Sequence, residues 1–124
     1  MNGDSSEREK AGLAVLQQLG WGRNERVHEL DADLWQIVTE TNFGTLWSRP
    51  GLSLRDRELI CIAILVASGA PGVALHFEHA HNVGLSAGQL KEIILQTIPY
   101  TGLPHALSAM KLLKQMPRDA TAER

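Results

Sequence analysis

Apolar residues recur every three or four positions along most of the chain, a spacing that predicts α-helices. The segment 6–19 begins with a serine and a glutamate at capping-box spacing, carries a leucine at every third position from residue 13, and stops at Gly20. Residues 22–28 look like a connector. A second helix is expected from about residue 31, with an apolar face that the pair Phe43-Gly44 interrupts.

The third predicted helix is apolar on every side. It begins near Ser53 and Asp56, which also have capping-box spacing, and continues through LICIAILVA to Gly69. Periodicity alone does not separate a buried strand from a buried helix, but the capping pair and the final glycine favour a helix of about 15 residues that is buried all round. In so short a chain, such a helix indicates burial at a subunit interface as well as in the core.

Three more helices are expected in the second half. One covers residues 72–84, and the next begins at Ser86, whose capping box with Gln89 is followed by an apolar face that Pro99 stops. Pro104 can start the last helix, and a polar tail begins at about residue 117. No alternating strand pattern occurs. The sequence therefore predicts an all-α bundle of about six helices in a single domain, residues 1–124.

Composition narrows the class of protein. The chain of 124 residues is 44% hydrophobic and 21% charged with a net charge of −2, and it has no basic block, so neither nucleic acid nor an acidic membrane is an expected partner. Its longest apolar run, residues 59–67, is about half of the ~20 residues that span a bilayer. The polar N-terminus is not a signal peptide, so we expect a cytoplasmic protein. The single cysteine, Cys61, excludes an intrachain disulfide and is expected to be a buried, inert thiol.

Histidines form the densest group of candidate functional residues. His76 and His79 are spaced to share one helix face, and His81 points away from it. Two ligands are too few for a metal site, and the Glu-x-x-His pair of di-iron proteins occurs only once, as Glu78 with His81, so no metal is expected. Acid–base chemistry needs only one histidine in a pocket. The alternative is that His76 is a buried packing histidine and that the other two lie at the surface or at an interface.

Three further residues have both a chemical and a structural interpretation. Glu58 is either a pocket carboxyl group or a first-turn carboxylate paired with an arginine. Arg49 is either an anchor for a substrate carboxylate or part of an interface ion pair. Tyr100 either donates a hydrogen bond to a substrate oxygen or covers the core. Neither a Gly-x-Ser-x-Gly elbow nor a phosphate-binding glycine loop is present, which argues against a serine hydrolase.

Two long segments resemble the carboxymuconolactone decarboxylase family in order and spacing: FGTLWSRPGLSLRDRELICIAILVASG, followed by ALHFEHAHNVGLSAGQLKEIILQTIPYTGLPHA. The resemblance implies an all-α, AhpD-like fold and a homo-oligomer, a trimer or a hexamer. The redox branch of this superfamily has a Cys-x-x-Cys pair before its histidine. Counted back from His76, those positions hold Gly72 and Gly69, so thiol peroxidase chemistry by that route is excluded.

What the resemblance implies for function is a cofactor-free lyase of aromatic catabolism. The namesake removes carbon dioxide from gamma-carboxymuconolactone, a small carboxylated lactone that serves as its own electron sink, so no cofactor is needed. His76 is then the proton donor or oxyanion partner, with Glu58 and Tyr100 orienting and Arg49 and His79 binding the substrate.

The chain departs from the namesake at two positions. It has Gly72 in place of a glutamate and Glu78 in place of an arginine, which leaves the specific substrate open. An isomerase or dehydratase acting on a related small acid, and a non-catalytic oligomeric binding protein, are the alternatives.

Overall fold

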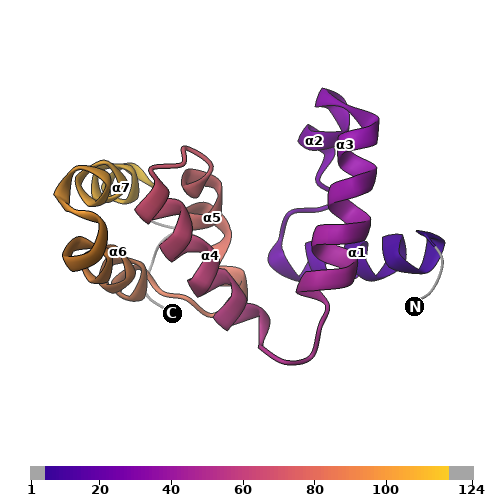
Figure 1. Cartoon of the computed structure of the whole chain (residues 1–124), viewed down its shortest axis with the longest axis horizontal. Helices are drawn as coiled ribbons and strands as arrows, with labels where there is room; N and C mark the ends of the chain where they lie inside the picture. The colour runs from indigo at the N-terminus through magenta and orange to yellow at the C-terminus, as the bar shows by residue number, and fades with distance from the viewer. Residues whose placement is uncertain (1–4, 118–124) are drawn as a thin grey trace. The chain divides into compact units, whose positions relative to one another are not determined.

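The computed structural model describes residues 5–117, and within that range the chain is helical without strands (Figure 1). It divides into two compact units, Met1–Leu54 and Arg55–Arg124, which are described separately. The all-α class is confirmed, with seven α-helices in the described range rather than about six. The single domain over residues 1–124 stays a prediction, and its polar tail lies outside the described residues except for Pro117. No described helix combines the length and the hydropathy needed to cross a membrane.

Unit 1 contains α1 (Ser5–Leu19), α2 (Glu25–Leu30), α3 (Ala32–Ile37) and the π-helix η1 (Val38–Trp47), which continues directly from α3 (Figure 1). Helix α1 lies against η1. The contact is made by backbone, because a Cβ at Gly12 would collide with the carbonyl oxygen of Thr39, and a Cβ at Gly44 with that of Arg8. Glycine lowers helix stability by about 1 kcal/mol relative to alanine, and here it allows this close approach.

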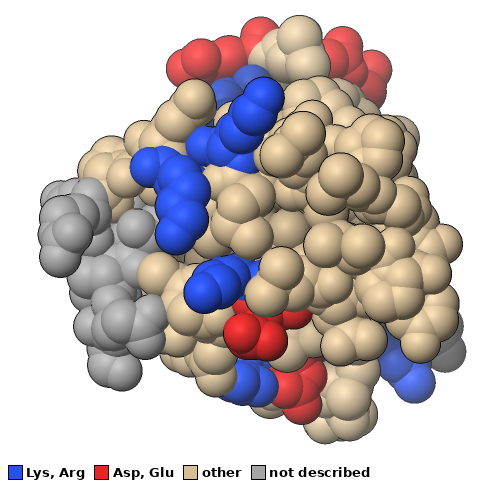
Figure 2. Space-filling view, turned by 90° about the vertical axis from the view of Figure 1, so that its left-hand side faces the viewer, with Lys and Arg blue, Asp and Glu red and all other residues tan. Residues whose placement is uncertain are grey.

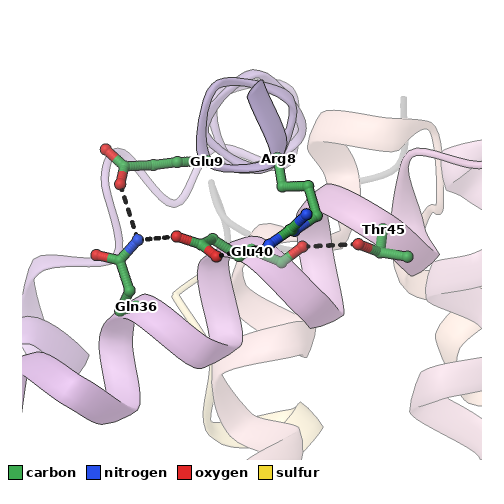
Figure 3. Close-up of polar contacts among 5 residues, drawn as sticks. All are labelled: Arg8, Glu9, Gln36, Glu40 and Thr45. Atoms are coloured by element: carbon green, nitrogen blue, oxygen red, sulfur yellow. Dashed lines mark hydrogen bonds and ion pairs between the residues drawn. The ribbon is translucent and has the colours of Figure 1, made fainter. Parts of the chain in front are cut away.

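Polar side chains bridge α1 to α3 and to η1 (Figure 3). The Gln36 amide donates to the Glu9 carboxylate over 3.0 Å and also to Glu40. Glu40 in turn forms an ion pair with Arg8, whose Nη2 lies 3.6 Å from Oε1 of the carboxylate. Beside this network, Phe43 packs between two tryptophans, with ring centroids 6.0 Å from Trp21 and 5.8 Å from Trp47.

Two expectations for unit 1 are wrong. Phe43 and Gly44 do not interrupt a helix: both are buried within η1, and the glycine serves close packing. The expected connector 22–28 contains the start of α2, after Asn24 in the left-handed conformation with φ 59°. Helix α2 is only six residues long and buries none of its side chains, so it lacks the apolar period by which a helix is recognised.

Unit 2 contains α4 (Leu54–Ser68), α5 (Val73–His79), the 3₁₀ turn η2 (Ala80–Val83), α6 (Ala87–Thr101) and α7 (Leu103–Gln115). Its core draws on every one of these elements. The buried members are Ile62, Val66, Val73, Phe77, Ala80, Leu85, Leu90, Ile93, Ile94, Ala106, Ala109 and Leu113. The predicted capping box of α6 is confirmed, because the Ser86 hydroxyl accepts from the Gln89 amide N–H and the Gln89 side chain accepts from the Ser86 N–H.

Unit 2 also corrects two expectations. Helix α5 ends at His79, and the chain continues to Val83 as a 3₁₀ turn. Pro99 does not stop α6, since it lies in the last turn and the helix continues to Thr101, where Gly102, with φ 89°, caps it. In the single chain, Ile60 and Ile64 of α4 are 45% and 60% exposed, and the expected burial of this helix at a subunit interface stays a prediction.

Candidate active site

Helix α4 carries Glu58 and Cys61 on one face, near the start of its apolar run. Glu58 and Cys61 are three residues apart and therefore lie one turn above each other. Glu58 is almost fully buried, with 1% of its surface exposed, and Cys61 is half-buried. A carboxyl group so far from water is costly unless it has a hydrogen-bonded or charged partner, so this face requires a polar residue opposite it.

His76 is that residue, and it comes from α5. Its Nδ1 lies 2.7 Å from Oε1 of Glu58, and its Nε2 lies 3.8 Å from Sγ of Cys61. Phe77, the next residue, is fully buried and anchors this part of α5 in the core. Both ring nitrogens of His76 therefore contact side chains from α4.

The surroundings of His76 favour its protonated form. Burial alone lowers the pKa of the imidazole, but the hydrogen bonds to Cys61 and Glu58 and the charge of the Glu58 carboxylate outweigh burial and raise the pKa from 6.5 to about 9. At neutral pH the ring is then an imidazolium whose Nδ1–H donates to Glu58 and whose Nε2–H points towards Cys61. The arrangement is a proton donor oriented by a buried carboxylate.

The two carboxylate oxygens of Glu58 differ in their contacts, because only Oε1 has a hydrogen bond within the described part of the chain. Oε2 is buried and has no hydrogen-bond partner among the described residues. A buried acceptor without a partner costs free energy, so such atoms often mark places where a ligand or water binds. The cluster of Glu58, Cys61 and His76 offers oxygen, sulfur and nitrogen atoms within 4.8 Å of one another. With both imidazole nitrogens already hydrogen-bonded, we interpret the cluster as an acid–base group.

The structure brings together only some of the predicted site residues. Glu58 and His76 are in direct contact. The sequence left open whether Glu58 faces a pocket or pairs with an arginine, and the partner that the structure shows is His76. His79 is half-buried in the last turn of α5, outside the cluster. Arg49 is exposed in unit 1, while the cluster is in unit 2. The roles of Arg49 and His79 in substrate binding stay predictions.

Tyr100 lies at a different place in unit 2. It is 80% exposed and lines a groove of about 530 Å³ between α4 and α6, together with Leu59, Ala63 and Ile93. A second cavity, of about 430 Å³, lies between the end of α4 and α7. Neither of these two cavities is lined by Glu58, Cys61 or His76. Tyr100 therefore does not cover the core, and its orienting role stays a prediction.

Apolar side chains are also exposed on the last two helices. Leu95 and Tyr100 of α6 and Leu103 and Leu107 of α7 are each at least 40% exposed. Figure 2 views the molecule from the side on which these helices lie in Figure 1, and it shows lysines and arginines mainly in its left and central part, beside a broad area without charged side chains on the right.

Sequence reasoning missed Cys61. Its position in an apolar run suggested an inert thiol, whereas the structure places the sulfur next to the catalytic candidate His76. The available signal was the Glu-x-x-Cys spacing, which puts Cys61 on the same helix face as Glu58. The apolar neighbours of Cys61 obscured that signal, because most cysteines in such helices are packing residues.

Comparison with known proteins agrees with this helical arrangement. The model of the carboxymuconolactone decarboxylase family matches residues 32–115. The chain is 30% identical over 122 residues to 4-carboxymuconolactone decarboxylase of Acinetobacter baylyi, with 94% of this chain and 91% of that protein covered. It is 32% identical over 76 residues to nitrosuccinic acid decarboxylase npaB of Metarhizium robertsii, with 60% of this chain and 53% of that protein covered. The chain belongs to the carboxymuconolactone decarboxylase family.

Proposed function

We propose that this protein is a cofactor-free carboxy-lyase acting on a small carboxylated lactone or a similar acid that forms a stabilised carbanion. The observation that carries the proposal is the 2.7 Å contact between Nδ1 of His76 and the buried Glu58 carboxylate. This contact orients the ring and, together with the contact to Cys61, raises the pKa of His76 to about 9, so that the ring is protonated at neutral pH.

The names of the two relatives support this substrate class. Loss of carbon dioxide from a carboxylated unsaturated lactone leaves an electron pair that the conjugated carbonyl stabilises, and loss from the carbon beside a nitro group leaves a pair that the nitro oxygens stabilise. In both cases the substrate itself accepts the electrons, and the enzyme must supply a proton to carbon.

His76 is suited to that step. The carbon–carbon bond to the departing carboxylate breaks, its electrons move into the conjugated group, and carbon dioxide leaves. The proton on Nε2 then moves to the carbon, while Nδ1–H stays hydrogen-bonded to Glu58. Water returns a proton to His76 for the next cycle. Within this proposal Arg49 and His79 bind the substrate carboxylates, and Tyr100 donates a hydrogen bond to the substrate.

We further propose that the protein acts in the cytoplasm, in aromatic catabolism, as a homo-oligomer. The exposed Ile60 and Ile64 of α4 support self-association, because apolar side chains on an apolar helix are stabilised by burial against another subunit. Light scattering on the full chain distinguishes a trimer or a hexamer from a monomer.

The test is release of carbon dioxide and loss of ultraviolet absorbance with 4-carboxymuconolactone, and separately with nitrosuccinate. We expect His76→Gln to lower kcat/KM by about a hundredfold to ten-thousandfold. His28→Gln, which changes an exposed histidine of unit 1, is the matched control and should retain activity. The wild-type kcat/KM should fall as pH rises through about 9, because His76 then loses the proton that it donates.

Three outcomes contradict the proposal. Full activity in His76→Gln would show that His76 is not the proton donor of the reaction. Conversion of substrate without carbon dioxide favours an isomerase or a dehydratase, and binding without conversion favours a binding protein.

A further inference from the structure

The two nitrogens of His76 are held in unequal ways. Nδ1 donates a short, charge-assisted hydrogen bond to a carboxylate that is 1% exposed, and such bonds are strong. Nε2 faces the sulfur of Cys61 at 3.8 Å, and a thiol sulfur is a weak acceptor. A substrate can therefore displace the contact at Nε2 at small cost, whereas it cannot easily displace the contact at Nδ1.

This asymmetry determines where the reacting carbon binds. A proton moves from Nε2 only to an atom about 3–3.5 Å away. Because Sγ of Cys61 already lies on that side of the ring, a carbon that approaches Nε2 must lie against the sulfur. The neighbouring oxygen Oε2 of Glu58 is buried without a partner among the described residues, which is a second indication that this cluster accepts a ligand.

We propose that Cys61 is a substrate-contacting residue of the lyase site: its sulfur takes the Nε2 hydrogen bond of His76 in the empty enzyme, and the reacting carbon lies against it during turnover. This proposal rests on the proposed lyase function. It assigns a role in specificity to Cys61, because the volume of this side chain limits the groups that the reacting carbon can carry.

The first arm of the test changes that volume. Cys61→Ser keeps the size and a hydrogen-bond acceptor, and should retain most of the turnover. Cys61→Leu fills the space beside Nε2, and should lower kcat/KM roughly tenfold to a hundredfold, mainly through a higher KM. Ser68→Leu introduces the same side chain at an exposed position of α4, and should leave kinetics unchanged.

The second arm uses the only cysteine of the chain and does not depend on the folding of a variant. Iodoacetamide should add one carboxamidomethyl group per chain of wild type, measured by intact mass, and turnover should fall in proportion to the label. Nitrosuccinate, added first, should slow the labelling. Cys61→Ser treated in the same way should keep its turnover.

The outcomes separate the two proposals. Normal kinetics in Cys61→Leu, or full turnover in a fully labelled wild type, overturns the role of Cys61 and leaves the lyase assignment standing. If wild type releases no carbon dioxide from either substrate, the lyase assignment fails and the role of Cys61 in it fails as well.

Discussion

In unit 1, α1 and η1 meet through the backbone at Gly12 and Gly44, whereas in unit 2, α4 and α5 meet around the side chains of Glu58 and His76. The polar network of unit 1 joins α1 to α3 and η1 through partly exposed groups, while the Glu58 carboxylate is almost fully buried. The first contact depends on the absence of side chains, and the second depends on a matched pair of charges. Substitutions in the two units should therefore act through different physical terms.

The largest effect is expected from a methyl group at the glycine contact. Gly12→Ala should lower the free energy of unfolding of unit 1 by about 3 kcal/mol or more, because the new Cβ would overlap the carbonyl of Thr39 and force the helices apart. Urea unfolding followed by tryptophan fluorescence measures this unit selectively, since Trp21, Trp35 and Trp47 all lie within it.

Gly51→Ala is the matched control, because nothing lies within 4 Å of the Cβ position there. Gly51 lies in a turn, so alanine there should change the free energy of unfolding by less than about 1 kcal/mol. A Gly12→Ala protein as stable as wild type would therefore show that the helices do not touch as described.

Next in size is the pH dependence of unit 2. The pKa of His76 is raised from 6.5 to about 9 in the folded chain, so the folded state holds the proton more tightly than the unfolded state. The resulting stabilisation, roughly 3 kcal/mol, is fully present below about pH 6.5, declines between 6.5 and 9, and is lost above about 9. Urea unfolding followed by circular dichroism at pH 6, 8 and 10 measures it.

His76→Gln removes this term, so the stability difference between wild type and the variant should narrow as pH rises. His28→Gln should track wild type at every pH, since His28 is exposed in the other unit. A difference that is constant with pH would mean that His76 is not protonated against Glu58.

The smallest effect is expected in the polar network of unit 1. Glu40→Gln weakens the ion pair with Arg8 but keeps an oxygen that can accept from Gln36, so stability should fall by less than about 1 kcal/mol, and less at high salt (Figure 3). The same replacement at Glu58 leaves the His76 imidazolium without its charged partner in a buried position and should cost more. Equal losses at the two sites would remove the distinction between the units.

Local sequence signals predicted α6 better than η1, for a physical reason. Helix α6 is held by local signals, the Ser86 capping box and an apolar face of helical period, and both can be seen in a single segment. In unit 1 the close contacts join residues that are far apart in the sequence, such as Gly44 and Arg8. A glycine such as Gly44 can be interpreted either as the end of a helix or as a site of close helix packing, and the sequence alone does not decide between the two. A π-helix such as η1 also departs from the 3.6-residue period on which pattern analysis depends.

For the site, the sequence identified Glu58 and His76 as candidates but did not predict that they form a pair. Both residues were singled out for their chemistry, but their contact requires α4 and α5 to pack together, which no local pattern states. The contact of Cys61 with His76 was not predicted, because the apolar neighbours of Cys61 are typical of a packing residue. Arg49, Tyr100 and His79 were singled out for their side-chain chemistry; Tyr100 and His79 lie outside the cluster around His76, and Arg49 belongs to the other unit.

One contact of unit 2 bears on how the chain acquires its structure in time. Gly69, with φ 70°, ends α4, and the ring of His105 from α7 occupies the space that a side chain at residue 69 would need. The contact closes a loop that contains α5, η2 and α6, so it can form only after these elements have come together. Contacts between distant positions slow folding, because the entropy of closing the loop is lost before any contact compensates for it. Helix α7 is therefore expected to dock late, and a nascent chain that ends before residue 105 lacks the ring that packs against Gly69.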